Sequence, residues 1–281
     1  MNREITLSYE FFPPRTEAGR LKLADTRRVL ARQRPEFFSV TFGAGGSTRD
    51  NTLETVLDIQ QSGEAPAAPH LTCVGASNAE ILELLDQYRA AGIRHLVVLR
   101  GDPPSGLVGM GECKHAQDLV WLVREHHGDH FRIMVAAYPE CHPDAPHLLC
   151  DVAHFADKMA AGADVALTQY FFNADGYFHF LDLCRARGIE QPIHPGIMPI
   201  VNFANLRKFS KQCSAEIPRW LRKSMAAWQD DLESQRQFGI EVVSRLCEQL
   251  IDGGAPGLHF YTMNQSGLTL QILRNLGLAA D

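Results

Sequence analysis

Three observations predict that this sequence folds as a (β/α)8 barrel. Eight apolar, β-rich runs alternate with stretches of helical periodicity along the 281-residue chain, a pattern typical of parallel strands joined by crossover helices. Eight such units suit a barrel of roughly 250 residues better than an open, doubly wound sheet. The sequence also contains no internal repeat, low-complexity tract or linker. We therefore expect one α/β domain, a TIM barrel spanning residues 1–281.

The expected strands are short apolar runs rich in β-branched and aromatic residues. They cover residues 5–12, 37–42, 69–73, 95–99, 132–137, 165–171, 193–197 and 258–261. Pro13 and Pro14 must end the first strand, because two prolines remove two hydrogen-bond donors from the sheet and fix φ.

The expected helices lie between the strands and show apolar residues spaced three and four apart. They cover residues 18–32, 48–62, 78–91, 116–125, 146–161 and 174–187, and a longer excursion follows over residues 202–252. Asn78 is the expected N-cap of the third helix. Gly92, Gly162 and Gly188 directly follow helices, as C-terminal caps prefer.

Composition argues against several classes of protein. The net charge is −6 and no basic block is present, which disfavours nucleic acid or an anionic membrane as the main partner. No apolar run approaches about 18 residues, and Met1 leads into a charged strand without a signal peptide, so we expect a cytoplasmic protein. The seven cysteines are scattered without a CxxC pair. This favours free thiols in a reducing compartment and makes zinc at Cys141 and His142 a weak hypothesis.

Glu10 is the most informative single residue, because it stands near the end of the first strand between aromatic residues. Aromatic rings can exclude water, and burial raises a carboxyl pKa toward the value that a general acid needs near neutral pH. The alternative is a solvated glutamate paired with Arg15, which is the commoner fate of a lone charged residue.

Nearly every expected strand carries polar side chains at its C-terminal end, which is where barrel enzymes build their active sites. These residues are Glu10, Thr41, His70, Thr72, Arg100, Asp102, Tyr138, Glu140, His142, Gln169, His259 and Tyr261. Each alone has a structural explanation, such as a threonine favoured on a pleated surface or a salt bridge between Arg100 and Asp102. Together they predict one polar site with Glu10 as its acid.

Seven segments at these strand ends resemble the methylenetetrahydrofolate reductase family. They read EFFPPR from Glu10, SVTFGA from Ser39, APHLTC from Ala68, LRGD from Leu99, AYPE from Ala137, TQYFF from Thr168 and HFYT from His259. The segments run in order through almost the whole chain. The sequence is similar to the short bacterial form, which has no C-terminal regulatory domain.

The resemblance implies a flavoprotein oxidoreductase of one-carbon metabolism and methionine biosynthesis. A hydride would pass from NADH or NADPH to FAD and then, in a ping-pong scheme at one site, to 5,10-methylenetetrahydrofolate, which yields 5-methyltetrahydrofolate. This family holds FAD without a Rossmann domain, and the sequence has no G-x-G-x-x-G fingerprint that opens a helix after a strand. Relatives form homo-oligomers, and the same is expected here.

The resemblance also implies roles for individual residues. Glu10 matches the general acid, Asp102 matches a residue at the flavin edge that also contacts the pterin, and Gln169 matches an amide that binds substrate. The positions that match FAD-binding residues are Thr41, His70, Arg100, Asp102, His115, Ala116, Ala136, Tyr138, His142, Asp151 and Lys158.

Three positions depart from the family pattern. Met225, or the nearby Trp228, stands where relatives place a phenylalanine that stacks on substrate, and methionine can still cover a ring. Gln265 stands where an arginine is usual, and His115 stands where a tyrosine lines the adenosine region. Met225 and Gln265 are the expected substrate-binding residues besides Gln169. We expect the departures to affect substrate affinity and nucleotide preference and to leave the reaction class unchanged.

Two other functions fit the same residues. A metal-dependent barrel lyase or hydrolase could use Glu10, His70 and Asp102 around a divalent cation. A non-catalytic flavin- or folate-binding barrel is the other hypothesis, although the intact set of Glu10, Asp102 and Gln169 argues against it. The absorption spectrum of the purified protein separates the metal hypothesis from the flavin hypothesis, because a flavoprotein is yellow and is bleached by NADH.

Overall fold

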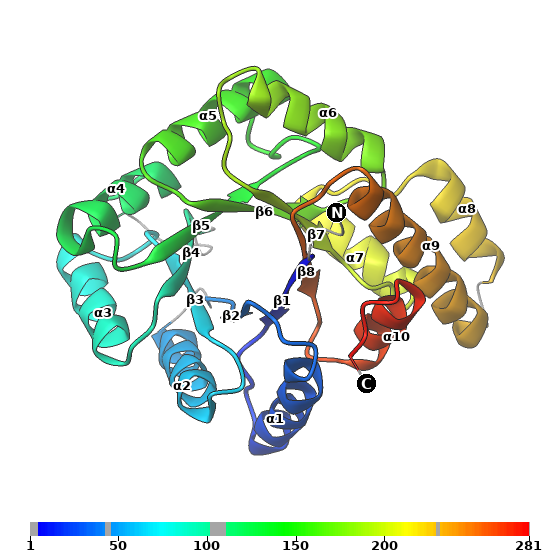
Figure 1. The fold of residues 1–281 in the computed structure, drawn as a ribbon, viewed down its shortest axis with the longest axis horizontal. Helices are drawn as coiled ribbons and strands as arrows, with labels where there is room; N and C mark the ends of the chain where they lie inside the picture. The colour runs from blue at the N-terminus through cyan, green and yellow to red at the C-terminus, as the bar shows by residue number, and fades with distance from the viewer. Residues whose placement is uncertain (1–4, 43–45, 102–110, 229–230, 281) are drawn as a thin grey trace.

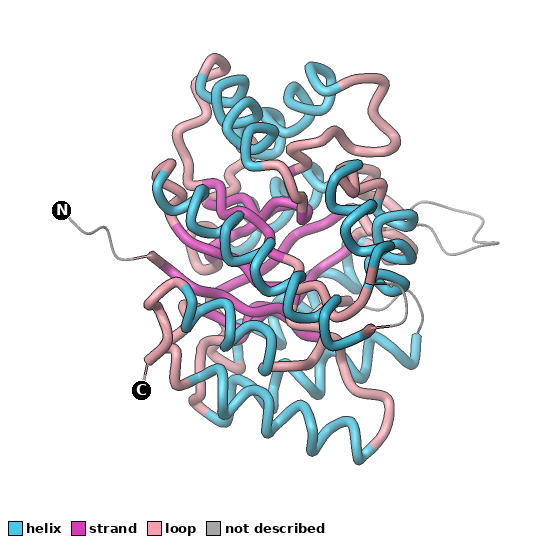
Figure 2. The backbone as a smooth tube through the Cα atoms, turned by 90° about the vertical axis from the view of Figure 1, so that its right-hand side faces the viewer, coloured by secondary structure: helices cyan, strands magenta, loops and turns pink. Residues whose placement is uncertain are grey.

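Eight parallel strands close into a barrel in the order β1 to β8, and β8 returns to pair with β1. The structure is a computed structural model that describes residues 5–42, 46–101, 111–228 and 231–280. The strands are β1 (Thr6–Phe11), β2 (Phe37–Val40), β3 (Ala67–Thr72), β4 (His95–Leu99), β5 (Arg132–Ala137), β6 (Val165–Tyr170), β7 (Ile193–Ile197) and β8 (Gly257–Tyr261). Helices surround the strands in Figure 1, and the perpendicular view of Figure 2 shows the same enclosure. The predicted TIM barrel is confirmed.

The helices follow the strands in the predicted alternation. They are α1 (Glu17–Ala31), α2 (Gly46–Ser62), α3 (Asn78–Ala90), α4 (Ala116–His127), α5 (Leu148–Ala160), α6 (Ala174–Arg185), α7 (Phe203–Cys213), α8 (Arg219–Ala227), α9 (Leu232–Asp252) and α10 (Gly267–Asn275). Helix α10 was not predicted, because Leu268, Leu270 and Ile272 alternate as they would in a strand. Among the described residues, no helix is both long and apolar enough to cross a membrane.

The predicted excursion over residues 202–252 resolves into three helices, α7, α8 and α9. Ser214 adopts a left-handed conformation with φ of 58° and ends α7. Pro218 stands at the N-cap of α8, where its fixed φ suits a helix start. The Asp231 side chain accepts a hydrogen bond from Ser234 N at 3.0 Å and caps α9.

Local capping explains most of the helix boundaries. The N-cap of α3 is Ser77 and not Asn78, because Ser77 and Glu80 form a capping box in which Ser77 N donates to Glu80 Oε2 at 2.8 Å. Strand β2 ends at Val40, two residues earlier than predicted. Gly92 and Gly162 directly follow the C-caps of α3 and α5 with φ of 77° and 115°, as predicted. Helix α6 ends at Arg185, so Gly188, with φ of 77°, lies two residues beyond its C-cap, Ala186.

The inside of the barrel has an apolar wall and a polar wall. Side chains alternate between the two faces of a strand, so every second residue points toward the barrel axis. From β2 to β6, six inward residues form one buried apolar cluster, made by Phe37, Ala68, Val97, Met134, Val165 and Leu167, and His70 of β3 also points inward, toward Glu10. On β7, β8 and β1 the inward residues include His194, His259, Ser8 and Glu10. The polar wall therefore leads to the C-terminal end of β1.

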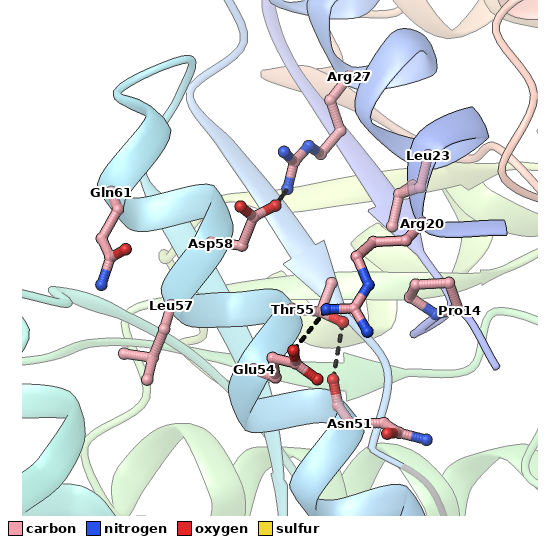
Figure 3. Close-up of a pocket in the computed structure, with 10 residues that line it drawn as sticks. All are labelled: Pro14, Arg20, Leu23, Arg27, Asn51, Glu54, Thr55, Leu57, Asp58 and Gln61. Atoms are coloured by element: carbon pink, nitrogen blue, oxygen red, sulfur yellow. Dashed lines mark hydrogen bonds and ion pairs between the residues drawn. The ribbon is translucent and has the colours of Figure 1, made fainter. Parts of the chain in front are cut away.

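A cavity of about 330 Å³ lies between α1 and α2 on the outside of the barrel (Figure 3). Ion pairs cross it, from Arg27 to Asp58 at 2.7 Å and from Arg20 to Glu54 at 2.5 Å. Arg27 is almost completely buried and also contacts Glu64 at 3.2 Å. None of the polar strand-end residues lines this cavity, so its ion pairs serve to join the two helices.

Gly257 begins β8 at a point where the barrel interior has no room for a larger residue. A Cβ atom at this position would lie 2.1 Å from Thr6 Oγ1 and 2.7 Å from the backbone oxygen of Thr6. We expect Gly257→Ala to lower the free energy of unfolding by about 1–3 kcal/mol, as overpacking of a core does. Urea denaturation measures the change.

Gly176→Ala in α6 is the matched control, because a Cβ atom there would meet nothing within 4 Å. Alanine is favoured over glycine inside a helix by roughly 0.5–1 kcal/mol, so this variant should be at least as stable as the native protein. Equal destabilisation by both substitutions would show that the close approach at Gly257 is not the cause.

Candidate active site

Glu10 is the second-last residue of β1 and points into the barrel, as predicted. Its side chain is 11% exposed. The rings of Tyr9 and Phe11 do not flank it, because neighbouring residues of a strand face opposite sides. Both rings pack against Phe38 in the core between the strands and the helices. The expectation that these rings exclude water from Glu10 was therefore wrong, and other side chains do so.

Two histidines contact the Glu10 carboxylate. His70 Nε2 on β3 lies 3.2 Å from Glu10 Oε2, an ion-pair contact without hydrogen-bond geometry. His259 Nε2 on β8 lies 3.5 Å from the same oxygen. His259 is completely buried, and its Nδ1 lies 2.8 Å from Ser8 Oγ. Ser8, Glu10, His70 and His259 are called the Glu10 cluster below.

The Ser8 hydroxyl contacts Nδ1 of His259 and can either donate to this nitrogen or accept from it. A neutral imidazole has one donor and one acceptor nitrogen. When Nδ1 of His259 accepts from the Ser8 hydroxyl, Nε2 carries the proton and faces Glu10. In that tautomer the cluster holds a proton-bearing nitrogen beside the carboxylate.

The pKa of Glu10 is lowered to about 2, whereas the sequence suggested that it would be raised. Burial does raise the pKa of this carboxyl, but the positive charge of His70 and the hydrogen bond with His259 act in the opposite direction and outweigh it. The expectation was wrong because β3 and β8 bring two histidines to Glu10. The lowered pKa favours the ionised form of Glu10 in the free protein.

The loop after β8 is bonded to the end of β1 and fixes the Glu10 backbone. Thr262 Oγ1 donates to Glu10 O at 2.7 Å. Asn264 Nδ2 donates to Phe12 O at 2.9 Å, and Phe12 N donates back to Asn264 Oδ1 at 2.8 Å. Gln265, a predicted substrate-binding residue, follows in this loop and is exposed.

A second polar group lies around the end of β5 and along α5, and it contains five predicted cofactor residues. Asp151 is buried and accepts a hydrogen bond from His142 N at 2.8 Å. The His142 ring packs edge-to-face on Tyr138, with centroids 4.5 Å apart. Lys158 Nζ donates to Ala136 O at 2.5 Å, and burial lowers the pKa of Lys158 to about 8.

Arg100 joins this second group from the end of β4. It forms an ion pair with Asp144 at 2.8 Å, and Asp144 N donates to His142 Nδ1 at 3.0 Å. The structure therefore brings together the predicted residues of β4, β5 and α5 through direct contacts.

The other predicted cofactor residues lie at separate positions on the rim. Thr41 directly follows β2, and its N donates to Phe11 O at 3.0 Å. His115 is the exposed N-cap of α4, and Ala116 is the first residue of that helix. Asp102 lies outside the described residues.

The predicted substrate-binding residues are not grouped. Gln169 is half-buried on β6 and lines a small cavity with Tyr138. Met225 is completely buried in the core, so the structure does not bring it to the Glu10 cluster.

Sequence reasoning gave His259 no role and left out Ser8. The alternation of a strand could have indicated Ser8, which lies two residues before Glu10 on the same face. Tyr261 follows His259 by two residues, and its hydroxyl donates to Thr168 O at 2.7 Å. The register that pairs Ser8 with His259 and Glu10 with Tyr261 could not be read from either strand alone.

Within the described ranges, no three His, Cys, Asp or Glu side chains are grouped so that they could hold a metal ion. Two ligands of the metal hypothesis, Glu10 and His70, instead contact each other. The third, Asp102, lies outside these ranges.

The chain matches the family model for methylenetetrahydrofolate reductase over residues 1–277. It belongs to the methylenetetrahydrofolate reductase family. It is 39% identical over 277 residues to the 5,10-methylenetetrahydrofolate reductase of Pectobacterium carotovorum subsp. carotovorum, a match that covers 99% of this chain and 92% of the relative. It is 38% identical over 274 residues to the Escherichia coli K12 protein of the same name, covering 98% and 91%. The similarity to the short bacterial form is confirmed.

Methylenetetrahydrofolate reductases are oxidoreductases that reduce methylenetetrahydrofolate, so the predicted enzyme class is confirmed. Methylenetetrahydrofolate reductase (NADH) 1 of Arabidopsis thaliana is 37% identical over 290 residues, which cover 98% of this chain and 49% of the plant protein. A solved structure from Clostridium thermocellum, described as binding two copies of 5-methyl-5,6,7,8-tetrahydrofolic acid, superposes with a TM-score of 0.65. It is 16% identical and covers 99% of this chain and 94% of its own, which shows a shared fold.

The lowered pKa of Glu10 predicts that this residue makes stability depend on acid pH. Its ionised form stabilises the fold above the ordinary value of 4.5, and this contribution is lost as the pH falls toward about 2. We expect the native protein to lose about 3 kcal/mol more unfolding free energy across this window than Glu10→Gln, which does not titrate. Urea denaturation across the window measures the difference, and parallel curves for the two proteins would contradict the ion-pair contacts.

Proposed function

We propose that this protein catalyses the FAD-dependent reduction of 5,10-methylenetetrahydrofolate to 5-methyltetrahydrofolate, with NADH or NADPH as electron donor. The observation that supports this function best is the Glu10 cluster, in which a buried carboxylate lies beside two histidines at the C-terminal ends of the strands. The two half-reactions use one site in turn, which is a ping-pong scheme. Assembly into a homo-oligomer stays a prediction.

The residues around β5 and α5 fit the phosphate-bearing part of FAD. Lys158 holds its ammonium group at a carbonyl oxygen, a neutral partner, so its charge is available to a phosphate. Arg100 adds a second cation on the neighbouring strand end. When bound, FAD supplies the chemistry of accepting and donating a hydride.

The remaining cofactor contacts are proposed along the rim from β2 to α5. These residues are Thr41, His70, Asp102, His115, Ala116, Ala136, Tyr138, His142 and Asp151. Buried Asp151 bonds the backbone of His142, which makes it a positioning residue for the loop that would face the cofactor.

The Glu10 cluster is proposed to supply the proton that folate reduction requires. The five-membered ring of the substrate must open to an iminium before it can accept a hydride, and ring opening needs a proton on the leaving nitrogen. Glu10 is the proposed donor of this proton, and His70 and His259 are the neighbours that set the proton affinity of its carboxylate.

The proposed substrate contacts surround this acid. Asp102 would stabilise the cationic iminium through its negative charge, and Gln169 and Gln265 would bond the substrate with their amides. Met225 is buried in the core, so its proposed contribution is indirect: it packs α8 against the rest of the barrel.

We expect Glu10→Gln to slow folate reduction by a factor of about a hundred or more, the usual contribution of a general acid. Reduction of the bound flavin by NADH should proceed at a near-normal rate, because that half-reaction needs no proton from Glu10. Anaerobic stopped-flow absorbance measures both half-reactions separately.

Glu140→Gln is the matched control, because Glu140 is another half-buried carboxylate at the same end of the barrel. Burial raises the pKa of Glu140, but this residue is not part of the Glu10 cluster. This variant should reduce methylenetetrahydrofolate at close to the native rate. A near-normal rate in Glu10→Gln would refute the assignment of the acid, and a colourless protein inactivated by chelators would favour the metal hypothesis.

We expect Lys158→Met to weaken FAD binding about tenfold or more, since a hydrogen bond to a charged group contributes roughly 1.5–3 kcal/mol. Burial lowers the pKa of Lys158 to about 8, so FAD affinity of the apoprotein should also fall as the pH rises above this value. Fluorescence titration of apoprotein with FAD measures both effects. Lys22→Met on α1 should leave the affinity unchanged, and an equal loss in both variants would contradict the assignment.

A further inference from the structure

The cavity between α1 and α2 takes no part in the proposed reaction, and its walls combine charged and apolar groups. Arg20 and Arg27 extend toward it from α1 (Figure 3), and buried Leu23 lines it from the same helix. Glu54 and Asp58 face the arginines from α2. The volume of about 330 Å³ is at the lower end of the range for ligand pockets. A ligand of this cavity would therefore be a small molecule.

Glu54 and Asp58 place two carboxylates on one side of α2. Residues four apart are neighbours on a helix surface, and both of these side chains are 59% exposed. Because like charges at this spacing repel each other, a positively charged group between them is stabilising. An ammonium group has three donors and can bond both carboxylates. The α2 side of the cavity therefore favours an ammonium group.

Each arginine has a second carboxylate partner besides the two on α2. Arg20 Nε lies 3.2 Å from Glu17 Oε2, and Arg27 Nε lies 3.2 Å from Glu64 Oε2. The α2 carboxylates can therefore turn toward a ligand while both arginines keep a partner. This matters most for Arg27, whose side chain is 4% exposed, because a buried charge without a partner is costly.

The arginines disfavour a ligand that carries an ammonium group alone. Arg20 Nη1 lies 2.5 Å from Glu54 Oε1, so an ammonium group bonded to Glu54 would lie close to the Arg20 guanidinium. Like charges at such a distance repel each other, and a carboxylate on the ligand offsets this repulsion by bonding Arg20. A carboxylate without an ammonium group would in turn face Glu54 and Asp58. The charges of the two helices together favour a zwitterion.

We propose that this cavity binds a free α-amino acid with an apolar side chain. Such a molecule carries its ammonium and carboxylate groups on one carbon atom, so the two groups can bond the facing helices at the same time. The ammonium group bonds Glu54 and Asp58, and the carboxylate bonds Arg20. The apolar side chain packs on Leu23 and Pro14, which line the same cavity. Among the described residues, those proposed for folate reduction do not line it, so the inference is independent of the proposed function.

Titration of the FAD-loaded protein with L-leucine tests the inference, and saturation-transfer difference NMR measures the affinity. We expect a Kd of about 1 mM, which is the scale for a ligand with so few atoms. Two analogues separate the charges of leucine, because 4-methylpentanoate lacks the ammonium group and 3-methylbutylamine lacks the carboxylate. Each analogue should bind about tenfold more weakly than L-leucine, since each loses the hydrogen bonds of one charged group.

The double variant Arg20→Gln/Glu54→Gln keeps the net charge and removes one partner from each charged group of the amino acid. We expect it to bind L-leucine about tenfold more weakly than the native protein. The matched control is Asp25→Asn/Arg28→Gln, which removes another exposed ion pair of α1, 2.5 Å long and outside the cavity. Exposed ion pairs contribute little to stability, so both variants should fold. The control should bind L-leucine like the native protein.

The inference is overturned if L-leucine does not bind with a Kd below about 10 mM, or if the two double variants bind it equally well. It is also overturned if either analogue binds as tightly as L-leucine. Equal binding of 3-methylbutylamine would show that the α2 carboxylates bind a simple cation. Equal binding of 4-methylpentanoate would show that the arginines bind a simple anion.

Discussion

A carboxylate inside a barrel is stable as an anion only when neighbouring groups replace the water that it has lost. The end of this barrel where Glu10 lies meets that requirement with side chains from three strands. His70 on β3 and His259 on β8 contact the Glu10 carboxylate, and Ser8 on β1 bonds the far nitrogen of His259. The two histidines that make the anion stable also lower the pKa of Glu10, so this residue by itself is a poor acid in the free protein.

The apolar wall of the barrel supports the polar wall. Phe37 belongs to the apolar cluster and stacks on the ring of His259 with centroids 5.9 Å apart. The imidazole is thereby held between an aromatic face and the Ser8 hydroxyl, which fixes its plane as well as its hydrogen bonds. On the outside of the barrel, Lys158 on α5 reaches the carbonyl of Ala136 on β5. The packing of α5 against the barrel therefore positions Lys158, the cation that is proposed to bind FAD.

The fold could be predicted from the sequence because its signals are local. Alternating apolar runs marked the strands, and Pro13 and Pro14 placed Glu10 at a strand end. The direction of the Glu10 pKa could not be predicted, because Glu10 and His259 are 249 positions apart in the sequence and meet only through strand register. The roles of Asp151 and Lys158 came from family resemblance and not from local pattern.

The pairing of β1 with β8 means that the Glu10 cluster is completed by the last strand to leave the ribosome. Contacts between residues so distant in sequence form late and slowly, because a long loop must be closed first. Until β8 docks, Glu10 lacks His259, and a carboxylate buried without its full set of partners favours the unfolded chain. A chain that lacks β8 cannot close the barrel and leaves Glu10 without His259, so it is unstable and a ready substrate for proteolysis. The carboxylate of the candidate active site thus also makes the stability of the fold depend on closure of the barrel.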